Sequence, residues 1–137
     1  MNTQKLEWEE KYSVGVKLID DQHKTMFDTI NQLIDVLAST PTKEKLDEII
    51  TRLVEYKKFH FVTEEGYFKE FNYENKEEHE AKHKEFTITL ERLIADSKGD
   101  SMVLAFGLVD FLEDWLINHL MTEDQKYVAC FHDHGLV

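Results

Sequence analysis

Apolar residues recur every three or four positions in four segments of the chain, at about residues 20–37, 42–71, 75–95 and 101–128. This spacing puts the apolar side chains of each segment on one face of an α-helix. Residues 1–19 show no such period and predict an N-terminal arm. Four amphipathic helices with short connections predict an all-α fold, an antiparallel up-down four-helix bundle.

Residues that interrupt helices stand between these segments. The predicted breaks are Asn72–Asn75, Gly99 and Pro41, which is the one proline in 137 residues. Asp20 is a good N-cap for the first helix. Because no linker or internal repeat is visible, we expect residues 1–137 to form one domain that ends in a tail at 129–137.

Five of the seven histidines stand where the helical pattern calls for a core residue. They are His23, His60, His79, His83 and His119. Glu64 extends the face of His60 by one turn, and Lys57 is the one polar residue that interrupts this face. A single histidine on an apolar face is more often a hydrogen-bonded core residue than a ligand. Together, five buried imidazoles and a carboxylate need more partners than apolar stripes offer, and a metal site would satisfy them all.

A further carboxylate on the fourth helix is ambiguous. Glu123 follows His119 by four residues and Asp124 by five. On a regular helix Asp124 points about 140° away from His119, so periodicity alone makes Glu123 the easier ligand. If Asp124 does reach the site, we expect a stretched side chain or a local distortion of the helix.

The overall charge excludes several classes of partner. Sixteen Lys and Arg against 28 Asp and Glu give a net charge of −12. Nucleic-acid binding and attachment to an anionic membrane favour the opposite sign. No apolar run is long enough to span a bilayer, and the first residues do not resemble a signal peptide. The single cysteine, Cys130, is typical of a cytoplasmic protein.

The ordered set of candidate ligands resembles the metal-ligand signature of the hemerythrin family, in its single-domain bacterial form. The set is His23, His60-x-x-x-Glu64, His79-x-x-x-His83 and His119-x-x-x-x-Asp124. Further matching positions are Trp8, Tyr12–Val16, Ile19–Lys24, His60–Glu65 and Trp115–His119. One departure is Glu74, where family members often have proline after the tyrosine. The resemblance favours Asp124 over Glu123, and Glu64 over Glu65.

The number of donors points to two metal ions, because seven side chains are too many for one six-coordinate ion. Two octahedral ions offer twelve positions, of which five imidazoles and two bridging carboxylates fill nine. The resemblance implies that the ions are iron and that a bridging oxide or hydroxide fills two more, leaving one position open. By the same resemblance, His79, His83 and His119 bind one iron, His23 and His60 bind the other, and Glu64 and Asp124 bridge the pair.

The function that the resemblance implies is reversible binding of dioxygen, as a hydroperoxide at the open iron, for oxygen transport, storage or delivery. Such a protein is not an enzyme, and an oxidase or oxygenase that receives the dioxygen is a candidate partner. Reversible binding requires a tight apolar pocket that keeps water out. The residues expected to line this pocket are Met26, Phe27, Phe61, Trp115, Leu116 and Leu120.

Other functions on the same bundle remain open at this point. A ferritin-like di-iron oxidase or iron-storage protein would carry Glu-x-x-His on two helices, and only Glu80-x-x-His83 fits that pattern. An oxygen or redox sensor module is usually joined to an output domain, for which 137 residues leave no room. A structural zinc site prefers four ligands, often with cysteine. We expect the tail histidines, His132 and His134, to be solvated.

Overall fold

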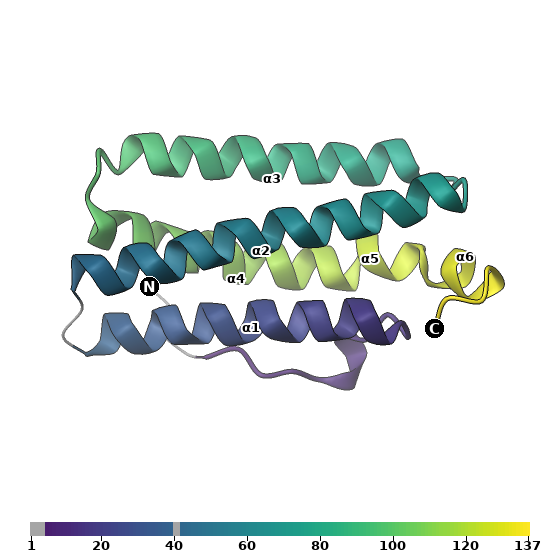
Figure 1. Ribbon diagram of the computed structural model, residues 1–137, viewed down its shortest axis with the longest axis horizontal. Coiled ribbons are helices and arrows are strands. Elements are labelled where there is room, and N and C mark those ends of the chain that lie inside the picture. The colour runs from purple at the N-terminus through teal and green to yellow at the C-terminus, as the bar shows by residue number, and fades with distance from the viewer. Residues whose placement is uncertain (1–4, 40–41) are drawn as a thin grey trace.

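Four long helices run side by side along the long axis of the molecule, and consecutive helices point in opposite directions (Figure 1). They are α1 (Lys17–Ala38), α2 (Lys43–Glu70), α3 (Lys76–Asp96) and α4 (Ser101–Met121). This computed structural model describes residues 5–39 and 42–137, and that part of the chain contains no strand. The predicted antiparallel four-helix bundle with an N-terminal arm is therefore confirmed. The predicted break at Pro41 lies outside the described residues.

The ends of the helices follow local sequence signals. The Thr42 hydroxyl accepts a hydrogen bond from the Lys45 backbone N–H at the start of α2, and the Asp100 carboxylate caps α4 in the same way. Between α2 and α3 the chain turns at Asn72, whose φ is +51°. Gly99, at φ +81°, makes the turn before α4 with a conformation that glycine adopts at little cost.

The first helix begins three residues earlier than predicted. Asp20 is not its N-cap, because Val16 takes that position in an extended conformation. The Asp20 carboxylate instead accepts hydrogen bonds from the arm, 2.5 Å from the Ser13 hydroxyl and 2.9 Å from the Val14 N–H. Asp20 therefore ties the arm to α1.

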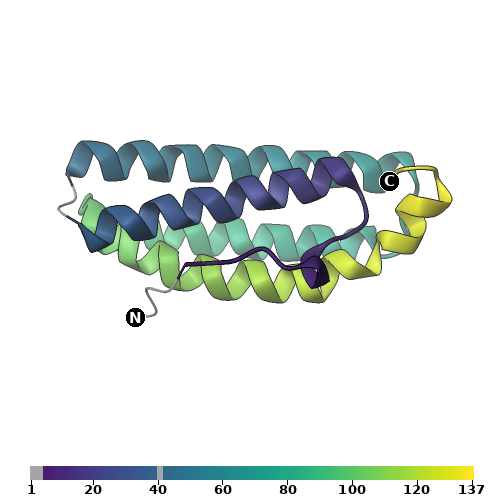
Figure 2. The ribbon, with the colours of Figure 1, turned by 90° about the horizontal axis from the view of Figure 1, so that it is seen from below.

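The N-terminal arm returns along the bundle and contains one short 3-10 helix, Glu10–Tyr12 (Figure 2). Its Trp8 ring packs edge-on against Phe27 at 5.5 Å between ring centroids. Asn31 on α1 holds the arm through two hydrogen bonds to the backbone of Leu6. The arm thus covers the bundle beside the middle of α1.

The fourth predicted helix, about 101–128, is not continuous. It ends at Met121, and two short helices follow at the same end of the molecule, α5 (Glu123–Lys126) and α6 (Val128–Asp133) (Figure 1). The tail predicted at 129–137 is therefore helical at its start, because Phe131 is fully buried against Tyr127 and neighbouring aromatic rings. His132 and His134 are exposed, as expected, although the His132 ring lies 2.9 Å from the Gly15 carbonyl.

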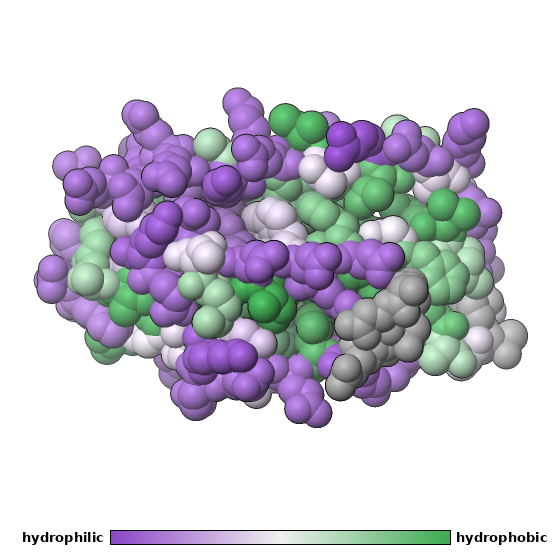
Figure 3. Space-filling view, turned by 180° about the vertical axis from the view of Figure 1, so that it is seen from behind, coloured by the Kyte–Doolittle hydropathy of each residue, from purple (hydrophilic) through white to green (hydrophobic). Residues whose placement is uncertain are grey.

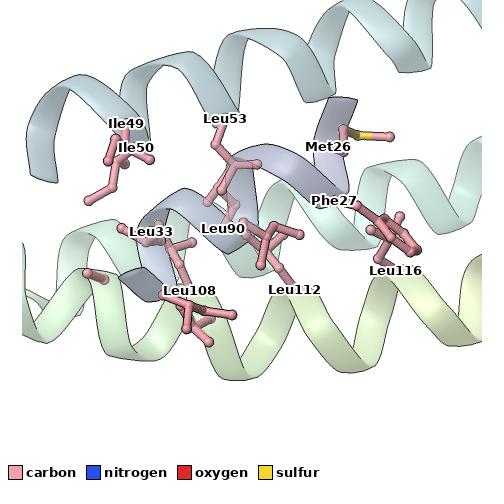
Figure 4. Close-up of a cluster of buried hydrophobic side chains, with 14 of the residues drawn as sticks. Met26, Phe27, Leu33, Ile49, Ile50, Leu53, Leu90, Leu108, Leu112 and Leu116 are labelled. Carbon is pink, nitrogen blue, oxygen red and sulfur yellow. The ribbon is translucent and has the colours of Figure 1, made fainter. Parts of the chain in front are cut away.

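The interior between the four helices is apolar over most of its length. Figure 4 shows side chains from all four long helices converging there, with Met26, Phe27 and Leu116 at one end of the cluster. Hydrophilic side chains cover much of the face seen in Figure 3. Within the described residues, no helix is long and apolar enough to cross a membrane.

Candidate metal centre

All seven candidate ligands lie together in the interior of the bundle, beyond the apolar cluster. They are His23 on α1, His60 and Glu64 on α2, His79 and His83 on α3, His119 on α4 and Asp124 on α5. Each is at most 6% exposed. Side chains from five helices therefore converge at one buried point.

The ligand atoms form two groups that share one carboxylate. Glu64 lies with His79, His83 and His119 in one group, and with His23, His60 and Asp124 in the other. The two groups have the composition that the family resemblance implies for the two metal positions, except that Asp124 lies in one group alone.

The separations within the groups match ligands of a common ion. The Nε2 atoms of His23 and His60 are 3.0 Å apart, as are those of His79 and His119. Glu64 Oε1 lies 3.3 Å from His60 Nε2 and 3.2 Å from His83 Nε2. Two atoms held about 2.1 Å from one ion at right angles are about 3.0 Å apart. The atoms are therefore spaced as neighbouring ligands would be.

Asp124 faces both groups of imidazoles. Its Oδ1 is 3.1 Å from His119 Nε2 and 3.2 Å from His79 Nε2, whereas its Oδ2 is 3.3 Å from His23 Nε2. The interruption at Thr122 makes this possible, because it breaks the regular turn that would point Asp124 away from His119. The predicted distortion of the helix is thus present. Glu123 instead pairs with Lys126 at 3.3 Å.

Several ligand atoms have no hydrogen-bond partner in the described part of the chain. They are Glu64 Oε1, His83 Nε2 and both carboxylate oxygens of Asp124, all of them buried. Leaving such groups unpaired costs about 1–3 kcal/mol each, and more when they are charged. Metal ions among these atoms would satisfy all of them together, so the residues present fit such ions.

Two imidazoles are oriented by acceptors that the sequence did not assign. His60 Nδ1 is 2.7 Å from Gln22 Oε1, and His83 Nδ1 is 2.8 Å from Glu65 Oε2. A hydrogen bond at Nδ1 fixes the tautomer and leaves Nε2 free to bind a metal. Gln22 is itself held by the Thr63 hydroxyl at 3.2 Å. In the sequence, only the position of Gln22 next to His23 could have indicated a role at the site. Its contact with His60 on α2 is a tertiary contact and leaves no local pattern.

Tyr127 is a further residue of the site that sequence reasoning missed. Its side chain is fully buried, and its hydroxyl donates a hydrogen bond to Glu64 Oε2 at 2.6 Å. Burial, together with the charges of Glu64 and Asp124, raises the pKa of Tyr127 well above 10, which keeps the hydroxyl protonated. The bond fixes one oxygen of Glu64 and directs the other toward the imidazoles.

The electrostatics of the centre favour cations. Burial alone would raise the pKa of Glu64, but the imidazoles of His60, His79 and His83 hold it well below 4.5. Burial lowers the pKa of His60 to about 4, so this ring is neutral at pH 7. Burial opposes protonation of His79 as well, but the nearby carboxylates of Asp124 and Glu64 raise its pKa to about 10. The carboxylates therefore attract a positive charge, which a metal ion would supply.

The six predicted pocket residues are buried or half-buried, and two of them stack on candidate ligands. Five of them are at most 7% exposed, and Trp115 is half-buried. The Phe61 ring stacks on His83 with centroids 3.8 Å apart, and Trp115 stacks on His119 at 4.2 Å. Phe27 and Leu116 lie close together at one end of the apolar cluster in Figure 4. Phe61 and Trp115 thus place aromatic rings directly against two candidate ligands.

Comparison with known proteins identifies the family. Residues 14–131 match the family model of the hemerythrin HHE cation binding domain. The chain belongs to the hemerythrin family. The match spans the whole set of candidate ligands, from His23 to Asp124.

Individual relatives agree with this assignment to the hemerythrin family. Bacteriohemerythrin of Clostridium acetobutylicum is 27% identical over 125 residues, which cover 88% of this chain and 97% of that protein. Myohemerythrin of Theromyzon tessulatum is 31% identical over 121 residues, or 88% of this chain and 89% of that one. A crystal structure of wild-type hemerythrin has 26% identity and a TM-score of 0.72, covering 91% of this chain and 96% of that one.

Proposed function

We propose that this protein binds dioxygen reversibly at a non-heme di-iron centre. The observation that carries the proposal is the position of Asp124, whose two oxygens face different sets of imidazoles, 3.1 Å from His119 and 3.3 Å from His23. A carboxylate in this position would offer one oxygen to each of two ions. Membership of the hemerythrin family supports iron as the metal and dioxygen as the ligand.

The seven side chains form two sets of ligands, one for each ion. His79, His83 and His119 would hold one iron, His23 and His60 would hold the other, and Glu64 and Asp124 lie close enough to both sets to be shared. By the family resemblance, an oxide or hydroxide would complete the set, and the iron held by His23 and His60 would keep one position for dioxygen. Two irons held there would supply the two electrons needed to bind dioxygen reversibly.

The remaining residues keep the centre in place and dry. Gln22 and Glu65 hold the rings of His60 and His83 in the orientation that a metal requires. The apolar side chains of Met26, Phe27, Phe61, Trp115, Leu116 and Leu120 belong to one hydrophobic cluster, which would keep water from the position of the bound dioxygen. Exclusion of water and external reductants favours release of dioxygen over its further reduction.

We further propose a binding protein rather than an enzyme, located in the cytoplasm, with an oxidase or oxygenase as a candidate recipient of the dioxygen. Five imidazoles and only two carboxylates among the ligands leave less anionic charge at the centre than ferritin-like di-iron sites provide. Glu80, which such a site would recruit, lies outside both ligand groups.

The test is to titrate the reduced, iron-loaded protein with dioxygen while following its visible spectrum. We expect one dioxygen per two irons and recovery of the starting spectrum under vacuum. Continuous consumption of dioxygen in the presence of a reductant, without a reversible spectral change, would identify an enzyme instead.

A further inference from the structure

A charged side chain lies within the apolar layer beside the metal centre. Lys57, one turn before His60 on α2, is only 4% exposed. Its ammonium group lies over three aromatic rings, 5.0 Å from the centroid of Phe61, 5.2 Å from Phe86 and 4.4 Å from Trp115. In the part of the chain that the structure describes, it has no ion pair and no hydrogen bond. Burial of an ammonium in this way is costly, and cation–π contacts offset only part of the cost.

Two of these rings connect the ammonium with the candidate ligands. Phe61 stacks on His83 and Trp115 stacks on His119, at 3.8 Å and 4.2 Å between centroids. A single aromatic ring thus lies between the Lys57 ammonium and the imidazole of His83, and another lies between the ammonium and the imidazole of His119. Glu64 and Asp124 both act on the Lys57 ammonium electrostatically, because their charges partly restore its pKa, which burial lowers to about 8. Lys57 is therefore positively charged at pH 7, and its charge interacts with the carboxylates of the centre.

The two rings also belong to the layer expected to form the wall of the open position. A neutral apolar wall admits dioxygen without preference for charge. A buried cation behind that wall favours a negatively charged ligand and a more reduced centre, because little water screens it.

We propose, on the basis of the proposed function, that Lys57 is a specificity-determining residue of the di-iron centre. Its positive charge raises the affinity of the centre for small monovalent anions and raises the reduction potential of the centre. The ligand class is a small anion that can occupy the one open position. Lys57 acts through its charge and binds no metal itself. A unit charge about 10 Å away at an effective dielectric constant of about 20 changes such an equilibrium by roughly tenfold.

The experiment measures azide binding and midpoint potential in the iron-loaded protein. Lys57→Met should weaken azide binding to the oxidised centre about tenfold. It should also lower the midpoint potential, and a tenfold change in the equilibrium constant of a one-electron reduction corresponds to about 59 mV. Lys57→Arg, which keeps the charge, should retain the wild-type values. Lys58→Met is the matched control, because Lys58 is its exposed neighbour and the same charge is lost.

The outcomes separate this inference from the function on which it rests. If Lys57→Met binds azide as the wild type does and keeps its potential, Lys57 is only a packed side chain and the inference is wrong. The same conclusion follows if Lys58→Met reproduces the effect. If the wild type itself takes up no pair of irons, the proposed function fails first. The two variants also allow a loss of folding to be recognised, since Lys57→Arg and Lys57→Met must both retain two irons for the comparison.

Discussion

The hydroxyl of Tyr127 donates a 2.6 Å hydrogen bond to Glu64 Oε2, and both side chains are completely buried. This contact joins the first residues after the last long helix to the carboxylate shared by both ligand groups. It links the aromatic cluster at the end of the bundle, which includes Phe68 and Phe131, to the metal centre. The end of the chain therefore helps to build the site.

Replacing Tyr127 with phenylalanine should leave a buried carboxylate oxygen without a donor. We expect the metal-free protein to lose about 1–3 kcal/mol of stability, measured by urea unfolding. Tyr67→Phe removes a hydroxyl from a half-buried tyrosine of the same cluster and is the control, with an expected change within about 0.5 kcal/mol. Equal losses in the two variants would show that the bond to Glu64 contributes nothing.

Gln22→Leu should weaken iron binding without unfolding the protein. The side chain accepts the Nδ1–H of His60, and loss of such an orienting contact typically costs 10- to 100-fold in metal affinity. Competition with a chelator under anaerobic conditions measures the change. Gln32→Leu, an exposed glutamine on the same helix, should keep the wild-type affinity. An unchanged affinity in Gln22→Leu would remove Gln22 from the site.

Two substitutions should show which carboxylate after His119 is the metal ligand, a choice that sequence spacing alone did not decide. They are Asp124→Asn and Glu123→Gln. Asp124 lies between both sets of imidazoles, whereas Glu123 pairs with Lys126. We expect Asp124→Asn to lose stable binding of an iron pair, as judged by iron content after gel filtration. Glu123→Gln should retain two irons per chain. The reverse pattern would make Glu123 the ligand.

The pH dependence of stability should reveal the buried charge of Lys57 in the metal-free protein. Burial lowers its pKa from 10.5 to about 8, so between these values the unfolded chain binds more protons and wild-type stability should rise with pH. The difference between the two values corresponds to about 3 kcal/mol. Below pH 8, Lys57→Met should therefore be more stable than the wild type. The difference in unfolding free energy between the two proteins should decrease by about 3 kcal/mol as the pH rises toward 10.5.

Urea unfolding of both proteins across this pH range measures the narrowing. Other titrating groups are common to the two chains and cancel in the difference. A difference in stability that stays constant from pH 7 to 10.5 would contradict the burial of a charged Lys57.

The sequence predicted the bundle and its ligand-bearing faces because both follow from helical periodicity. His60, His79, His83 and His119 continue apolar stripes, so their inward direction can be read without a structure. Asp124 could not be placed by periodicity, because its direction depends on the interruption at Thr122.

The contacts around the ligands were beyond the reach of the sequence for a different reason. Gln22 reaches His60 from another helix, and Tyr127 reaches Glu64 across 63 positions of the chain. Such pairs depend on how helices pack, and no local pattern marks them. Lys57 was visible as an interruption of an apolar face, but its three aromatic neighbours come from three helices.

The number of irons that the chain holds tests the central claim most directly. Ferrous iron is titrated into the metal-free protein without oxygen, and bound iron is counted per chain in the wild type, His119→Ala and His132→Ala. We predict saturation at two irons in the wild type and in His132→Ala, whose imidazole is exposed and belongs to neither ligand group, and no stable pair in His119→Ala. Saturation of the wild type at a single iron, or loss of iron in His132→Ala, would contradict the account.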